Sequence, residues 1–204
     1  MPPRAGTPAL PVWPKHLLDA QVIGPRVCLH PPQASDAREY LAASASSRRH
    51  FGRWMPVMKD RRAFMAYVER RATRRTFSFL IRRREDDALI GTVGLNDIIQ
   101  SLTWSANLGY ALFAGYTGQG YMTEAIDLAL RFGFRSLRLH RVEAGIQPLN
   151  QPSRAVVQRL NFRLEGLAKE LIRINGRWRD HERWALLARE YEPRVRGVVR
   201  ASDT

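Results

Sequence analysis

Residues 115–125 read GYTGQGYMTEA, a glycine-containing loop whose surroundings decide the fold of the chain. The loop follows an apolar, strand-like run at residues 108–113 and leads directly into an amphipathic pattern typical of a helix. Gly118 and Gly120 would let a ligand approach the backbone closely, and the first N–H groups of a helix have no partner inside the helix. Most glycine pairs are ordinary turns, but a loop between a strand and a helix favours a seat for a phosphate or pyrophosphate group.

The composition limits the class of protein. With 204 residues and 45% hydrophobic content, the chain can form one well-buried domain. An apolar run of about 18 residues, as a membrane span needs, does not occur. Five prolines within the first 20 residues interrupt any signal-peptide core. The single cysteine, Cys28, cannot form an internal disulfide and is interpreted as a small buried hydrophobe. We therefore expect a cytoplasmic protein, and we expect no metal site.

The charge of the chain is strongly positive. The formal net charge is +14, and only three of the 33 basic residues are lysine, an excess of arginine that codon bias alone would also produce. Such a surface attracts polyanions, for example RNA or a ribosome, and also an acidic cofactor. The arginines are densest at residues 61–62, 70–71, 74–75 and 82–84. No aromatic base-stacking motif accompanies them, so we interpret most of them as a solvated basic face.

The order of the predicted elements is that of a mixed α/β domain. Strands are predicted at residues 26–30, 76–81, 88–99, 103–113 and 141–146. Helices are predicted at about residues 36–45, 60–74, 122–137 and 152–160. Asp36 with Glu39 resembles a capping box for the first helix, and Asp60 is the expected cap of the second. Residues 1–20 are interpreted as a Pro-rich extension, residues 21–190 as one domain and residues 191–204 as a loose tail.

The last part of the domain contains the clearest turn signal. Residues 171–174 and 177–184 flank Asn175-Gly176, the preferred pair for a type I′ hairpin turn. An uninterrupted register would place Lys169 opposite Glu182 and Glu170 opposite His181.

Five blocks in this order resemble the GCN5-related N-acetyltransferase (GNAT) family. They are LGYALF at residues 108–113, GQGYMTEA at 118–125, LHRVEA at 139–144, NQPS at 150–153 and LNFRLEG at 160–166. RHFGRWMP at residues 49–56 and NGRWRDH at 175–181 resemble the ribosomal-protein alanine N-acetyltransferase (RimJ/RimL-like) branch. The resemblance covers roughly residues 25–190. It implies the α/β (α+β) GNAT acyl-CoA acetyltransferase fold, with a mixed, mostly antiparallel sheet of six or seven strands that splays in the middle between flanking helices. It also implies acetyl-CoA as donor and direct transfer to an amine.

The resemblance implies a set of cofactor-binding residues. They are Leu112, Phe113, Thr117, Gly118, Gln119, Gly120, Tyr121, Met122, Thr123 and Asn150. The family's pyrophosphate motif has Arg or Gln, two residues, Gly, one residue, then Gly or Ala; here Thr117 and Met122 depart from it. Losing the arginine removes a charge while the backbone donors remain, so binding is expected to survive with moderately lower affinity. Leu112 and Phe113 match positions whose backbone holds the pantetheine arm and the thioester carbonyl, although plain strand burial also accounts for them.

Two residues near the expected start of a helix match positions beside the thioester. Asn150 matches a position that hydrogen-bonds the pantetheine arm, and Ser153 matches a hydroxyl that protonates the departing thiolate. Both residue types are also ordinary helix caps, worth about 1 kcal/mol each. His50, Phe51 and Trp54 match one wall of the family's acceptor groove, and the region of residues 177–181 lies near the other; core packing is the alternative for Trp54.

The general base is absent from its usual place. Relatives often carry a glutamate before the Gly-Tyr of this strand, where this chain has Asn107. The nearby carboxylates are Asp97, Glu124 and Glu143; Glu124 is interpreted as complementing the helix dipole, and Glu143 as a surface residue. An α-amine has a pKa near 7.7–8.0, so about a tenth is neutral at pH 7, whereas deprotonating a lysine costs roughly 4–5 kcal/mol. The missing carboxylate therefore favours a peptide N-terminus over a lysine side chain as acceptor.

Three functions fit the sequence. The first is acetyl transfer from acetyl-CoA to a protein N-terminus, with a ribosomal protein as the expected partner. The second keeps the chemistry but uses a small amine or an antibiotic, although the basic surface repels polycationic acceptors. The third is a non-catalytic, ribosome- or RNA-associated protein whose cofactor loop has decayed, as Thr117 and Asn107 would suggest. The sequence makes no prediction of the oligomeric state.

Overall fold

The structure is a computed structural model that describes residues 13–52, 54–73 and 75–200. Its strands are β1 (Gln21–Ile23), β2 (Val27–His30), β3 (Ala72–Thr73), β4 (Thr76–Arg83), β5 (Leu89–Ile99), β6 (Ser105–Leu112), β7 (Arg141–Ile146), β8 (Arg163–Ile174), β9 (Arg177–Leu187) and β10 (Val198–Arg200). Its α-helices are α1 (Lys15–Leu18), α2 (Ala37–Ser46), α3 (Arg48–Phe51), α4 (Arg61–Glu69), α5 (Tyr121–Arg131) and α6 (Gln151–Arg159). Two 3-10 segments, η1 (Ala34–Asp36) and η3 (Ala188–Glu190), and a π-helical turn, η2 (Phe132–Ser136), complete them. No helix in these ranges is long and apolar enough to cross a membrane.

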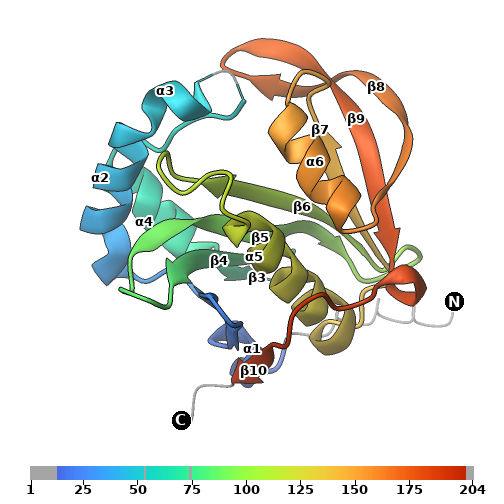
Figure 1. Cartoon of the computed structure of the whole chain (residues 1–204), viewed down its shortest axis with the longest axis horizontal. Coiled ribbons are helices and arrows are strands. Elements are labelled where there is room, and N and C mark those ends of the chain that lie inside the picture. The colour runs from blue at the N-terminus through green and yellow to red at the C-terminus, as the bar shows by residue number, and fades with distance from the viewer. Residues whose placement is uncertain (1–12, 53, 74, 201–204) are drawn as a thin grey trace, which may run out of the picture.

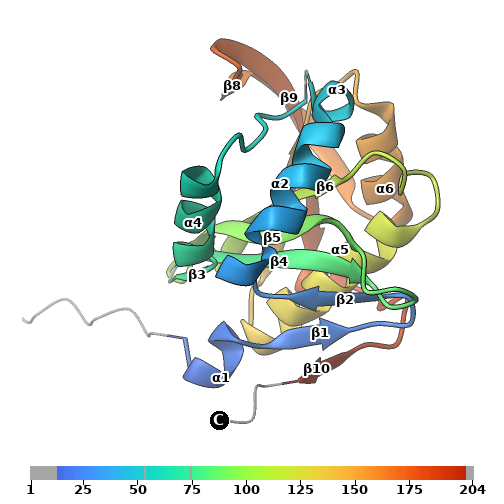
Figure 2. The ribbon, with the colours of Figure 1, turned by 90° about the vertical axis from the view of Figure 1, so that its left-hand side faces the viewer.

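All the strands belong to one sheet. Its order is β10-β1-β2-β4-β5-β6-β7-β9-β8, with β3 paired to β4 beside this path. Every described pair is antiparallel except β6 with β7, which run parallel. Helices α5 and α6 cover one face of the sheet, and α2 and α4 cover the other (Figures 1 and 2). The predicted mixed, mostly antiparallel sheet flanked by helices is therefore confirmed, with more strands than the six or seven expected.

Each face of the sheet has its own apolar core. On β4, Phe77 and Phe79 point toward the α5 layer, where both pack edge-on against Phe132 of η2 with ring centroids 5.2 Å away. Leu80, on the opposite side of the same strand, packs with the α2 and α4 layer. The alternation predicted for this strand is therefore present, but both faces are buried. Cys28 on β2 is half-buried, and burial raises the pKa of its thiol, as befits a packing residue.

Residues 13–20 and 191–200, which the sequence analysis assigned to a Pro-rich extension and a loose tail, pack against the domain. Trp13 is buried and contacts Phe77 with ring centroids 5.6 Å apart. At the other end, β10 pairs antiparallel with β1 (Figure 2). The chain reaches β10 because Asp127, fully buried on α5, accepts hydrogen bonds from the backbone N–H groups of Arg194 and Val195, both at 3.0 Å. Residues 1–12 and 201–204 lie outside the described residues.

The C-terminal hairpin has the predicted turn but not the full predicted register. Asn175 and Gly176 have φ values of 49° and 81°, as a type I′ turn requires. Ile172 faces Arg179 as expected, but the register then shifts, so that Leu167 faces Glu182 and Ala168 faces His181. The predicted Lys169–Glu182 and Glu170–His181 pairs are therefore wrong. The cause is Asp180, whose carboxylate binds the Glu170 N–H and the Lys169 ammonium, both at 2.9 Å, in place of the regular ladder.

One of the two predicted helix caps is present in the structure and the other is not. Asp60 caps α4 by accepting the Ala63 N–H at 2.8 Å, as expected, but the helix ends at Glu69 and Arg74 lies outside the described residues. Asp36 does not cap α2; its carboxylate accepts the Gln33 N–H at 2.8 Å and closes η1.

Arg82 is a structural residue rather than part of a solvated basic face. Its guanidinium binds Asp36 at 2.8 Å and Glu39 at 2.9 Å, and its Nε donates to Nε2 of His30 at 3.1 Å. Burial lowers the pKa of His30, which keeps the ring neutral and able to accept this bond.

Candidate active site

The middle of the sheet opens where its two parallel strands part. β6 and β7 pair only over residues 105–107 and 141–143. Beyond this short ladder β6 continues to Leu112 and β7 to Ile146 without pairing to each other. The splay that the family resemblance implied is therefore present, and it leaves a gap through the sheet between the α5–α6 layer and the α3 segment.

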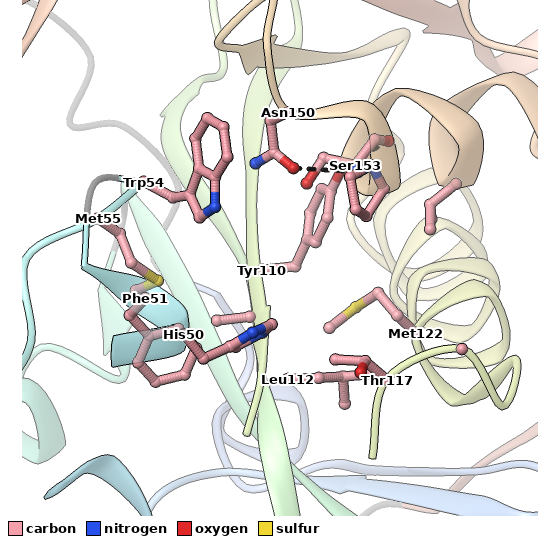
Figure 3. A pocket seen from close by; sticks show the side chains of 14 residues that line it. His50, Phe51, Trp54, Met55, Tyr110, Leu112, Thr117, Met122, Asn150 and Ser153 are labelled. Carbon is pink, nitrogen blue, oxygen red and sulfur yellow. Dashed lines mark hydrogen bonds between the residues drawn. The ribbon is translucent and has the colours of Figure 1, made fainter. Parts of the chain in front are cut away.

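A cavity of about 170 Å³ lies beside this splay, along the unpaired end of β6. It is lined by His50, Phe51, Trp54 and Met55 at and after α3, by Tyr110, Ala111 and Leu112 of β6, by Thr117 and Gly118 of the loop, by Met122 of α5, and by Asn150, Pro152, Ser153 and Val156 at α6 (Figure 3). Nine of the predicted site residues thus meet here from distant parts of the chain. Phe113, Gln119, Gly120, Tyr121 and Thr123 were also predicted, but they do not line the cavity.

The glycine loop has the backbone geometry that an anion seat requires. Gly115, Gly118 and Gly120 have φ values of 94°, 76° and 83°, a region that side chains strongly disfavour. Gly120 is the N-cap of α5 and supplies no side-chain hydrogen bond, so no cap side chain occupies the first N–H groups of this 11-residue helix. A Cβ built on Gly118 meets nothing within 4 Å. The loop therefore offers open space in front of helix N–H groups, at the edge of the cavity.

Side-chain hydrogen bonds to backbone carbonyls hold the glycine loop in place. Gln119 Nε2 donates to the Gly115 carbonyl, and Arg26 Nη1 donates to the Gln119 carbonyl, both at 3.0 Å. The Arg26 guanidinium also lies 4.2 Å from the centroid of the Tyr121 ring. Hydrogen bonds from Arg26 and Arg83 hold the pKa of Tyr121 below its ordinary value. Gln119 and Tyr121 thus shape the loop instead of lining the cavity.

Glu124 has a more specific role than the predicted dipole partner. Its side chain is buried, and Oε1 accepts the N–H groups of Arg26 at 2.7 Å and Val27 at 3.0 Å. It therefore ties the start of β2 to the first turn of α5 and holds Arg26 beneath the glycine loop. The sequence carried no signal for this contact because the partners are nearly 100 residues apart.

Asn150 and Ser153 combine the two roles that the sequence left open. Asn150 Oδ1 accepts the Ser153 N–H at 3.3 Å and caps α6, while both side chains line the cavity (Figure 3). Tyr110, which the sequence reasoning missed, donates its hydroxyl to the Ser153 carbonyl at 3.3 Å. Burial raises the pKa of Tyr110 to about 12, so the hydroxyl stays protonated as a donor. The alternation of β6, which puts residue 110 on the same face as Leu112, was the signal that could have found it.

The α3 side of the cavity is braced from two directions. Gln147 Nε2 donates to the Trp54 carbonyl at 3.2 Å, and Asn175 Nδ2 of the hairpin turn donates to the Gly52 carbonyl at 2.9 Å. Phe51 lines the cavity and is also buried, so it belongs both to the cavity wall and to the apolar core. Residues 177–181, which were expected near a second wall, do not line the cavity; Arg53 lies outside the described residues.

Phe113 departs most from its predicted role. Its N–H donates to the Ile90 carbonyl at 2.8 Å, and its carbonyl accepts the Tyr116 N–H at 3.3 Å. Its ring packs in the core between Phe51 and Tyr40. The strand burial that the sequence offered as the alternative therefore describes Phe113, while Leu112 reaches the cavity.

Comparison with known proteins decides the family. Residues 26–163 match the model of the acetyltransferase (GNAT) domain. The chain belongs to the GNAT acetyltransferase family. A Bacillus subtilis relative named "Probable N-acetyltransferase YjcK" is 35% identical over 172 residues, covering 80% of this chain and 95% of the relative. The Escherichia coli [ribosomal protein uS5]-alanine N-acetyltransferase is 28% identical over 162 residues, covering 75% and 84%.

Solved structures agree with this assignment. Mycobacterium smegmatis RimJ in complex with CoA-disulfide superimposes with a TM-score of 0.77 at 28% identity, covering 86% of this chain and 90% of RimJ. The ribosomal-protein-S5-alanine acetyltransferase of Vibrio fischeri gives a TM-score of 0.74 at 25% identity, covering 85% and 99%. The family and its named relatives identify this GNAT protein as an acetyltransferase enzyme, related to the ribosomal-protein N-acetyltransferases.

Proposed function

We propose that this GNAT enzyme transfers an acetyl group from acetyl-CoA to the N-terminal α-amine of a protein, with a ribosomal protein as acceptor. One observation carries the proposal: beside the splay, the cavity is lined both by the α5–α6 layer and by the segment at and after α3, so a donor and an acceptor can reach each other from the two sides. The donor side is built by the glycine loop, α5 and α6, and the acceptor side by the segment at and after α3.

The donor side fits the chemistry of acetyl-CoA. The pyrophosphate is doubly anionic, and the loop offers backbone N–H groups, the positive end of the α5 dipole and open space at Gly118. The apolar side chains of Leu112, Met122 and Val156 suit the pantetheine arm. When bound, acetyl-CoA supplies a thioester whose carbonyl carbon an amine can attack.

The residues of the chain position the reaction. Asn150 Oδ1 accepts the hydrogen bond that caps α6, and its Nδ2 group can donate to an amide carbonyl of the pantetheine arm. Ser153 exposes its hydroxyl to the cavity beside Asn150, where it can donate a proton to the departing sulfur. A thiolate with a reference pKa near 8.5 is already a tolerable leaving group, so Ser153 assists the transfer without being essential.

The acceptor side suits a peptide. His50, Trp54 and Met55 form an open wall where the first side chains of a peptide can pack. The net charge of +14 favours an acceptor carried on a polyanionic particle such as the ribosome. Two of the relatives, from Escherichia coli and Vibrio fischeri, are named as acetyltransferases of alanine in a ribosomal protein. A ribosomal acceptor implies that the enzyme works in the cytoplasm.

A thiol-release assay with acetyl-CoA tests this function. The panel contains alanine-, serine- and methionine-starting peptides, the same peptides with a blocked α-amine and one internal lysine, and small amines such as polyamines. Free peptides are expected to release CoA at least tenfold faster than blocked peptides or small amines, with mass spectrometry locating the acetyl group on the α-amine. Acetyl groups found only on lysine side chains, or turnover of small amines alone, would contradict the proposal.

A further inference from the structure

A second cavity adjoins the first along β6. It has a volume of about 510 Å³ and lies on the sheet face opposite α5 and α6. Residues 107–109 of β6 line this second cavity, while residues 110–112 of the same strand line the first. The boundary lies just beyond the last β6–β7 pair, Asn107 with Glu143, where the sheet begins to open. Along β6, the second cavity therefore ends where the donor cavity begins.

Four carboxylates lie near the glycine loop or the splay, and three of them are already engaged, Glu182 by Arg154 at 3.0 Å. Glu124 is bound to the backbone of Arg26 and Val27. Glu143 lines the second cavity but is paired with Arg141 at 2.7 Å and with Arg183. Burial opposes ionisation of Glu143, but the hydrogen bonds from Arg141 and Arg183 outweigh it and hold its pKa below the ordinary value.

Asp97 is the remaining carboxylate, and it lines the second cavity. Among the residues that the structure describes, it makes no salt bridge, and Asn107 Nδ2 donates to its Oδ2 at 3.2 Å. Its backbone has a φ of 49° at a register irregularity of β5, between Asn96 and Ile99. Bulges of this kind re-aim a side chain, and here the bulge brings the carboxylate beside Asn107.

We infer that Asp97 is the catalytic group that receives the ammonium group of the acceptor and takes its proton, with Asn107 as the residue that positions it. This inference rests on the proposed transfer to an α-amine. The ammonium gives one proton to the Asp97 carboxylate, which passes it to solvent. The free amine nitrogen bonds to the thioester carbonyl carbon, the C–S bond breaks with its electron pair on sulfur, and the second nitrogen proton moves to sulfur. The products are an N-acetyl peptide and CoA thiol.

The charged groups facing this position fit a cationic ligand. Asp97 and Glu143 supply two carboxylates and Arg183 one guanidinium, which Glu143 already binds. Leu171 and Ile172 of β8 form an apolar, partly exposed rim that suits an apolar group of the acceptor. The second cavity thus combines an apolar rim with a carboxylate that forms no salt bridge with any described residue. These two features complement the side chain and the ammonium group of a peptide N-terminus.

Asp97→Asn tests the inference directly. With an alanine-starting peptide at pH 7, kcat/KM for the peptide is expected to fall about tenfold, because about a tenth of the α-amine is already neutral at this pH and reacts without a base. Calorimetry should give the same Kd for acetyl-CoA as the parent enzyme. The rate of the variant should keep rising with pH through the α-amine pKa near 8, because only free amine then reacts. Adding Asn107→Asp to this variant should recover activity by returning a carboxylate to the facing position.

Glu69→Gln is the matched control, because Glu69 is an exposed carboxylate on α4 that lines neither cavity. It should leave kcat/KM unchanged. If the parent enzyme acetylates peptides and the Asp97→Asn variant keeps kcat/KM within threefold of the parent value, with the same pH profile, the inferred role of Asp97 is overturned. The proposed function would still stand in that case. A parent enzyme that acetylates no peptide N-terminus would overturn the proposed function, and the inference with it.

Discussion

Gly118→Glu is expected to lower kcat/KM for acetyl-CoA about 1000-fold or more. Gly118 lines the donor cavity, and a side chain there enters open space directly in front of the α5 N-terminus. A carboxylate about 4 Å from a phosphate, at an effective dielectric constant of 20, is repelled by about 4 kcal/mol. Each 1.36 kcal/mol is tenfold in rate, so repulsion alone accounts for about three powers of ten. Steady-state kinetics with varied acetyl-CoA measures the effect.

Gly118→Ala is the control that separates backbone strain from charge. Its φ of 76° costs alanine about 1–2 kcal/mol, while the new methyl group meets no neighbour within 4 Å. We expect a loss of about tenfold at most. Gly120 is a poorer target, because a Cβ there lies 3.6 Å from Arg26 Nη1, which would pair with an introduced glutamate. Equal activity of the alanine and glutamate variants would contradict the assignment of the pyrophosphate site to this loop.

Asp127→Ala is expected to lower the free energy of unfolding by about 3 kcal/mol. The carboxylate is fully buried and accepts two backbone N–H groups, from Arg194 and Val195, that would lose their acceptor. Hydrogen bonds to a charged group are worth about 1.5–3 kcal/mol each, and buried donors left unpaired add a penalty. The loss should also release β10 from β1, because these contacts lead the chain to the sheet edge. Urea unfolding followed by circular dichroism measures the change.

Two variants calibrate this result. Asp127→Asn keeps one acceptor oxygen and should cost about half as much. Asp60→Ala removes the exposed cap of α4, a single hydrogen bond to Ala63, and should cost about 1 kcal/mol. If Asp127→Ala proves no more harmful than Asp60→Ala, the C-terminal segment is not held as the structure indicates.

The parts of the molecule that the sequence predicted are those with local signals. The glycine loop, the Asp60 cap and the Asn175-Gly176 turn each depend on residues that are only a few positions apart in the sequence. The splay and the meeting of α3, β6 and α6 followed from the family resemblance, since no local pattern encodes them.

The features that the sequence missed depend on distant partners. β10 forms because Asp127 binds a segment 67 and 68 residues further along the chain. The core position of Phe113 depends on its backbone pairing with Ile90 and Tyr116. The lack of a carboxylate at Asn107 and the nearby carboxylates Asp97, Glu124 and Glu143 were visible in the sequence, but only the structure shows that the β5 bulge places Asp97 beside Asn107.

Calorimetric titration of the enzyme with acetyl-CoA tests most directly the claim that the cavity beside the splay is the donor site. We predict one saturable site per chain with a Kd below about 1 mM, the upper range for enzyme substrates, and loss of that binding in Gly118→Glu but not in Gly118→Ala. A cooperatively folded protein that binds no acetyl-CoA at this concentration, or a Gly118→Glu variant that binds it as tightly as the parent, would contradict the account.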